Sequence, residues 1–142
     1  MEDKTILPHL EAMHEYRGYT CAVLLMPLGH RCGYVGIPKG KPYYGFKYGE
    51  LDFVACHGGL TYSEIFLNAD GVPDERWWIG FDCLHAYDHP DIEAIRRVFG
   101  EKQAEVVERY SLPYGEVRTL GFCERDCDLI VDQLLEAGED DD

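Results

Sequence analysis

Residues 20–37, TCAVLLMPLGHRCGYVGI, decide the fold of this chain. The continuous apolar run TCAVLLM (20–26) predicts a buried strand. The tripeptide PLG that follows predicts a turn, and HRCGYVGI (30–37) predicts a strand that returns beside the first. Gly33 and Gly36 weaken this second run as a strand and indicate either a bulge or a close approach of the backbone to another segment.

The rest of the chain predicts further strands and then helices. We expect strands at 51–56, 60–66 and 76–83, and helices at 1–17, from an N-cap at Asp88, at 101–110 and at 119–137. Cys123, Cys127, Ile130 and Leu134 share one face of the last helix, which makes them core residues. Because helices follow strands rather than alternate with them, we predict an α+β fold: a single antiparallel sheet of about 4–5 strands with helices packed on one face.

Length and charge restrict the kinds of partner. The 142 residues fit a single domain over residues 1–142, in which 138–142 form an acidic tail. Thirteen basic and 27 acidic residues give a net charge of −14, which argues against binding nucleic-acid polymers or anionic membranes. No apolar run approaches the ~18 residues of a membrane span, and the N-terminal residues have no signal-peptide pattern, so we expect a cytoplasmic protein. We also expect no resident cofactor.

The segment HGGLTYS (57–63) predicts a ligand site. Its glycine pair has two interpretations: a tight hairpin turn, or a bend in one strand that leaves room for a ligand. In the strand WWIGFDC (77–83), alternation sends Trp78, Gly80 and Asp82 to the face opposite the core, where a large ring, a gap and a carboxylate resemble the wall of a site. The alternative is that Trp78 is buried and Asp82 is satisfied within the protein.

A second signal is local charge. No acidic residue lies between Glu15 and Glu50, an interval that carries five basic residues and is rich in glycine and tyrosine. Such a patch in an acidic protein favours a small anionic ligand, and its alternative is a surface strip that pairs with the acidic remainder. Together the two signals predict these ligand-binding residues: His57, Gly58, Gly59, Thr61, Tyr62, Trp78, Asp82, Arg31, Lys39 and Lys41.

Two catalytic alternatives remain. His57, Asp82, Cys83 and His85 stand at predicted strand ends and are weak candidates for metal ligands, since imidazole, thiolate and carboxylate bind zinc but no standard ligand spacing is present. Nucleophilic catalysis by Cys56 is disfavoured, because neighbours on a strand point to opposite faces and Cys56 would not reach His57.

Three motifs occur in a fixed order: GHRCGYVGIPKGKPYYG, HGGLTYS and WWIGFDCLHAYD, followed by an amphipathic helix. Over residues 29–135 the chain resembles a family of small, mostly uncharacterised bacteriophage and prophage proteins. The resemblance implies a phage origin and the cytoplasm of an infected bacterial host, and it implies no catalytic residues.

The leading hypothesis is a protein that binds or sequesters a phosphate-bearing or nucleotide-like small molecule, in a counter-defence role. One alternative is a hydrolase that uses His57, Asp82 and His85, with or without a metal. The other is an acidic decoy that binds a host protein, and a homo-oligomer remains open in each case.

Overall fold

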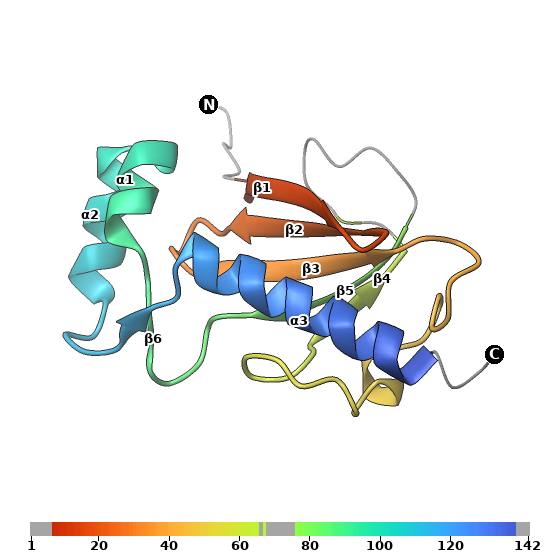
Figure 1. Cartoon of the computed structure of the whole chain (residues 1–142). Helices are drawn as coiled ribbons and strands as arrows, with labels where there is room; N and C mark the ends of the chain where they lie inside the picture. Colours follow the sequence, from red (N-terminus) through yellow and green to blue (C-terminus); the bar gives the residue numbers. More distant parts are fainter. Residues whose placement is uncertain (1–6, 66, 68–75, 139–142) are drawn as a thin grey trace.

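The computed structural model describes residues 7–65, 67 and 76–138, and its architecture is α+β, as predicted (Figure 1). The acidic residues 139–142 and the first six residues of the predicted N-terminal helix lie outside the described part of the chain. In chain order the elements are β1 (His9–Tyr16), β2 (Tyr19–Leu25), β3 (Arg31–Ile37), the 3-10 helix η1 (Tyr48–Glu50), β4 (Tyr62–Glu64), β5 (Trp77–Asp82), β6 (Asp88–His89), α1 (Ile92–Phe99), α2 (Glu101–Tyr110), β7 (Glu116–Val117) and α3 (Leu120–Gly138).

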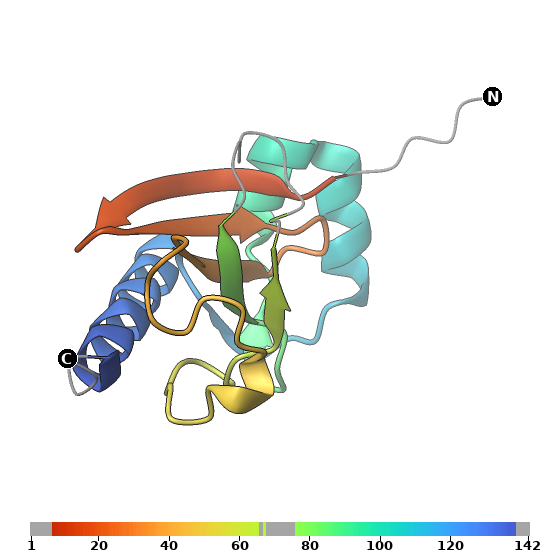
Figure 2. The ribbon, with the colours of Figure 1, turned by 90° about the vertical axis from the view of Figure 1, so that its right-hand side faces the viewer.

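Five strands form one antiparallel sheet in the order β1-β2-β3-β5-β4, and the short β6 and β7 pair in parallel beside it. The long helix α3 crosses one face of the sheet and packs on β1, β2 and β3. Helices α1 and α2 pack on each other at one end of the sheet instead of on its face. Figure 2 views the molecule from the opposite end, where the loop after β3 lies.

Both faces of the sheet are buried, which corrects the predicted division of β5 into a core face and a site face. The α3 side carries Ile79 and Phe81 of β5 together with the inward stripe predicted for the last helix. Trp78 points to the other side and is completely buried, in a second core with Leu24 and Tyr34. Trp78 is therefore a packing residue, and the alternative interpretation of its burial is the correct one.

Glycines in the sheet accommodate rings from the neighbouring strand. Gly33 is paired with Phe81 and Gly36 with Trp78 across the β3–β5 ladder, while Gly80 is paired with Tyr34. A Cβ atom at Gly33 would lie 2.5 Å from the Phe81 ring, and one at Gly80 would lie 2.4 Å from the Tyr34 ring. The close backbone approach predicted for β3 is confirmed, and its ladder with β5 has no bulge.

The predicted helix at residues 1–17 is wrong where the structure describes it, because residues 9–16 form β1. Arg17 and Gly18 both have positive φ, at 51° and 91°, which is the geometry of a two-residue type I′ turn. This turn folds β1 back on β2 with Tyr16 paired to Tyr19. Within β1, Ala12, His14 and Tyr16 are half-buried while the residues between them are exposed. This alternation of burial has the two-residue period of a strand, which the helical spacing of the apolar residues did not indicate.

Two other local predictions are corrected. Residues 51–56 form turns rather than a strand, so Gly58 and Gly59 do not join two strands of a hairpin. The N-cap of α1 is Asp91, whose side chain accepts a hydrogen bond from the Ala94 backbone, and Asp88 has a different role. In the described part of the chain, no helix is both long enough and apolar enough to cross a membrane.

Arg31 is the buried charge that joins the sheet to the helical end. Its side chain is 4% exposed and donates to Glu11 on β1 at 2.6 and 3.0 Å, and to Asp91 at 2.9 Å. It also donates to the backbone carbonyl of Arg118 at 3.1 Å. One guanidinium thus fixes the edge strand β1, the N-terminus of α1 and the segment that leads into α3.

Replacing Arg31 with methionine should be strongly destabilising. The substitution keeps much of the side-chain volume but leaves the Glu11 and Asp91 carboxylates without their cation, which costs about 3–5 kcal/mol for a buried pair. Chemical denaturation of Arg31→Met against the wild type measures the loss. Arg17→Met, which removes the exposed ion pair with Asp132, is the matched control and should change the unfolding free energy far less. Equal effects of the two substitutions would contradict the role given to Arg31.

Candidate functional site

The side chain of His57 meets a buried carboxylate. His57 Nε2 lies 2.8 Å from Oδ2 and 3.0 Å from Oδ1 of Asp88, whose side chain is 2% exposed. The His57 backbone N–H donates to Asp126 of α3 at 2.8 Å, and the Phe122 ring stands edge-on to the imidazole with the centroids 5.4 Å apart. His57 is therefore held by α3 on one side and by Asp88 on the other, with 18% of its side chain exposed.

Asp88 collects several donors. Arg118 Nε donates to its Oδ1 at 2.8 Å, and the His85 backbone N–H donates to its Oδ2 at 3.0 Å. Burial alone would raise the pKa of Asp88, but the hydrogen bonds from His57, Arg118 and His85 outweigh it and lower the pKa below its ordinary 3.8. Asp88 is therefore ionised at neutral pH and presents a fixed negative charge to His57.

His85 completes the cluster. Its ring lies 5.5 Å from that of His57, and its Nε2 lies 3.5 Å from Oδ1 of Asp82. Asp82 is oriented by hydrogen bonds from the Thr61 hydroxyl at 3.0 Å and from the Leu84 backbone at 3.1 Å. Gly58 has a φ of 72°, and a Cβ atom there would lie 2.0 Å from His85 Nε2. Glycine at position 58 therefore leaves the space that the His85 ring occupies.

This arrangement suits a cation. One ligand atom from each of His57, His85 and Asp88 lies within 4.8 Å of the other two, and two imidazoles with one carboxylate are a ligand set that zinc uses in catalytic sites. Asp82 beside His85 is the kind of outer carboxylate that orients a metal-binding imidazole. Asp126 adds a third carboxylate, and Arg118 is the guanidinium that pairs with Asp88.

A cavity of about 290 Å³ adjoins the cluster through Asp88. It lies between α2, the turn before β3 and the segment that follows β5, and its wall is mainly apolar. Nδ1 of His30 is buried in this region and has no hydrogen-bond partner among the residues that the structure describes. Burial lowers the pKa of His30, which keeps its imidazole neutral. The lining residues are Leu28, His30, Cys83, Leu84, Asp88, Pro90, Gln103, Val106, Val107, Tyr110 and Ser111.

Some of the predicted site residues gather and others do not. His57, Gly58, Thr61, Asp82 and His85 lie together, and Gly59 belongs to the same turn through its hydrogen bond to the Cys56 carbonyl.

Cys83 is a buried core residue and is not one of the clustered metal candidates. Its Sγ lies 3.7 Å from that of Cys123, and this contact together with burial raises its pKa, so the thiol stays protonated. Tyr62 packs against Tyr34 on the second core, beside Trp78. Burial raises the pKa of Cys56 to about 12, which removes the driving force for thiolate chemistry there.

The predicted basic patch does not form around His57. Arg31 is buried between carboxylates, and Arg17 is paired with Asp132. Lys39 and Lys41 are exposed on the loop after β3. Two carboxylates contact His57, Asp88 at the imidazole and Asp126 at the backbone N–H, and they would oppose direct binding of an anion there.

Sequence reasoning missed Asp88, Arg118 and His30 as members of the site. One signal for Asp88 was present, because Asp82, His85 and Asp88 recur at intervals of three residues and a turn at residues 85–88 brings them together. Arg118 had no such signal, since it reaches Asp88 through the pairing of β6 with β7. No protein-family model, curated protein or solved structure matches the chain.

Replacing Asp88 with asparagine tests this charge network. The change keeps the shape of the side chain but removes the acceptor charge for Arg118 and His57, which should cost about 1–3 kcal/mol at pH 7. Because the folded pKa of Asp88 is lowered, its contribution is complete above the ordinary value of 3.8 and is lost as the pH falls below it.

The measurement is chemical denaturation of wild type and variant from pH 7 down to pH 3. The difference in unfolding free energy should hold until about pH 4 and then shrink. A difference that stays constant over the whole range would show that Asp88 does not act through its charge.

Proposed function

We propose that this protein is a metal-dependent hydrolase for a small phosphate-bearing molecule. The observation that carries the proposal is the meeting of His57, His85 and Asp88 beside the cavity, since their ligand atoms lie within 4.8 Å of one another. A divalent cation such as zinc at this point turns an acidic site into one that accepts an anion. The metal then supplies the phosphate contact that the sequence led us to expect from the basic interval.

The reaction follows from the ligand set. His57, His85 and Asp88 would hold the metal, and three protein ligands would leave a coordination position for water, whose pKa the metal would lower to about 7. The metal would thus supply a nucleophile for a phosphate ester: a P–O bond from the water oxygen would form, the bond to the leaving oxygen would break, and the proton given up by the water would pass to that leaving oxygen. Asp82 supports the step by orienting His85. Gly58 has no side chain and so leaves space for the His85 ring.

The cavity accounts for the rest of the substrate. Its apolar wall suits a ring or an aliphatic body, and His30 is one of the few polar residues that line it. A nucleotide-like molecule has this combination of a planar apolar body and an anionic group. In the phage setting that the resemblance implies, a host signalling nucleotide would be the substrate, and its removal would serve counter-defence.

Sequestration of an intact nucleotide is the second candidate, because a cavity beside a metal-bound phosphate would serve a binding protein equally well. The two functions differ in what is recovered. Protein loaded with Zn²⁺ is incubated with a panel of nucleotides and cyclic nucleotides, then denatured by heat, and the released compounds are identified by chromatography. Cleaved products identify a hydrolase, and bound but intact compounds identify a sequestering protein. If no compound of the panel is bound or cleaved, both candidate functions are wrong.

His85→Gln should lower the rate of hydrolysis by at least ~100-fold, since it removes a metal ligand rather than an outer partner, whose loss alone costs ~10–100-fold. His85 is more than one third exposed, so the fold should persist, and circular dichroism checks this. The matched control is His9→Gln, which changes an exposed histidine of β1 away from the cluster. Equal activity of the two variants would contradict the metal-ligand role of His85.

Val106→Trp tests the cavity separately. Val106 lines the cavity but is 44% exposed, so a larger side chain can enter the space without disrupting the core of α2. We expect weaker substrate binding, seen as a raised KM, while the affinity for Zn²⁺ in calorimetry stays unchanged. A variant that keeps the wild-type KM would show that the substrate lies elsewhere.

A further inference from the structure

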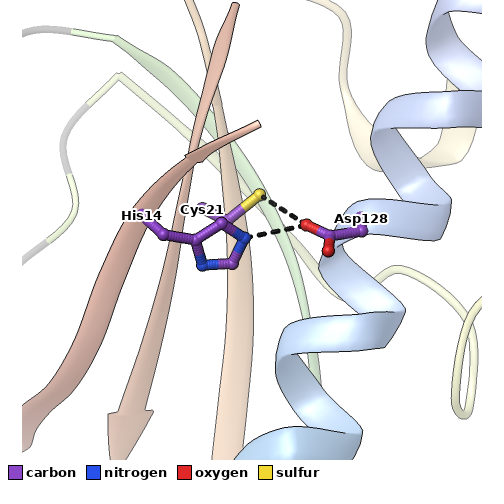
Figure 3. Close-up of side chains that lie close together, drawn as sticks. All are labelled: His14, Cys21 and Asp128. Atoms are coloured by element: carbon purple, nitrogen blue, oxygen red, sulfur yellow. Dashed lines mark hydrogen bonds and ion pairs between the residues drawn. The ribbon is translucent and has the colours of Figure 1, made fainter. Parts of the chain in front are cut away.

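A second group of metal-binding side chains lies between the sheet and α3, away from the His57 cluster. His14 on β1 and Cys21 on β2 are directly paired across the two strands, so their side chains share one face. Asp128 of α3 reaches down to both of them, as Figure 3 shows. Each of the three residues comes from a different element, and the sheet and the helix meet at this point.

The three ligand atoms are close enough to share one ion. His14 Nε2 lies 2.8 Å from Oδ1 of Asp128, Cys21 Sγ lies 3.8 Å from the same oxygen, and all three ligand atoms fall within 4.8 Å of one another. His14 and Asp128 are each 32% exposed, whereas Cys21 is fully buried. An ion can therefore enter from solvent between the two polar side chains and find the sulfur on the inner side.

From this geometry we infer that His14, Cys21 and Asp128 form a zinc-type metal site that clamps α3 to the β1–β2 hairpin. Nitrogen, sulfur and oxygen from three side chains are zinc ligands, and water fills the fourth position from the exposed side. Binding releases the Cys21 thiol proton to solvent, because the metal takes the thiolate. Cys127 is not part of the set, and its thiol donates to the Tyr34 backbone carbonyl at 3.6 Å.

This site is independent of the proposed hydrolytic centre, and its sulfur ligand allows the two to be distinguished. Cobalt(II) bound to a thiolate gives a charge-transfer band in the near ultraviolet, whereas His57, His85 and Asp88 contain no sulfur. Metal-free, fully reduced protein is titrated with Co²⁺ under anaerobic conditions. Because two metal sites are proposed in the chain, we expect the thiolate band to reach its full intensity by two equivalents.

Three variants assign the band. Cys21→Ser should abolish it, and His14→Gln should weaken Co²⁺ affinity at this site by more than the ~10–100-fold that loss of an outer partner costs. His14 is partly exposed, so His14→Gln keeps the test valid if Cys21→Ser does not fold. Cys56→Ser is the matched control, because Cys56 stands next to His57, and this variant should keep the full band.

His85→Gln should also keep the band even if hydrolysis is lost, so that failure of one site leaves the other measurable. A titration without a thiolate band would overturn the inference, as would a band that survives in folded Cys21→Ser or retains its wild-type affinity in His14→Gln. A readout without cobalt is the melting temperature in the His85→Gln background, where Zn²⁺ should still raise it, whereas it should not do so once His14→Gln is added.

Discussion

The buried guanidinium of Arg31 is the interaction on which the rest of the structure depends. A charge that is 4% exposed is stable only when it is surrounded by partners, and its partners come from three separate parts of the chain. Glu11 belongs to the edge strand, Asp91 starts α1, and the Arg118 carbonyl precedes α3. The helical pair α1 and α2 is therefore held in one position at the end of the sheet. The cavity lies between α2 and that end of the sheet.

The same constraint extends to the candidate site. While the Arg118 carbonyl accepts from Arg31, the Arg118 side chain donates to Asp88, and Asp88 holds His57. A continuous set of hydrogen bonds thus runs from the centre of the sheet to the imidazole. The position of His57 is set by buried groups on elements that are distant in sequence, which is how a site of this kind keeps its geometry without a bound ligand.

The sequence predicted the elements whose own residues determine them. The hairpin of β2 and β3, the strand β5 and the inward stripe of α3 follow from apolar runs and helical spacing, and all are confirmed. Prediction failed where a distant partner or an unusual turn decides the outcome. Arg17-Gly18 is not one of the common hairpin dipeptides, and Trp78 faces a second core that alternation alone cannot distinguish from a site.

The candidate site was predicted in part for the same reason. His57, Asp82 and His85 belong to neighbouring motifs and could be grouped from the sequence. Arg118, which pairs with Asp88 in the same cluster, lies 30 residues further along the chain. The basic interval misled because net charge along a sequence says nothing about which side chains are already neutralised. Arg31 contributes to that interval and is the least accessible cation among those predicted to bind a ligand.

The glycines that face aromatic rings across β3 and β5 have a consequence for how the sheet assembles. Each ring occupies the space of a missing side chain, so the two strands fit in one alignment only. A slip of two residues, which preserves the inward and outward faces, would set Phe81 opposite Val35 or Trp78 opposite Tyr34, where the space is already filled. A misaligned pairing of these strands would therefore lose ring packing on both faces of the sheet, so the side chains of the central ladder favour the native register during folding.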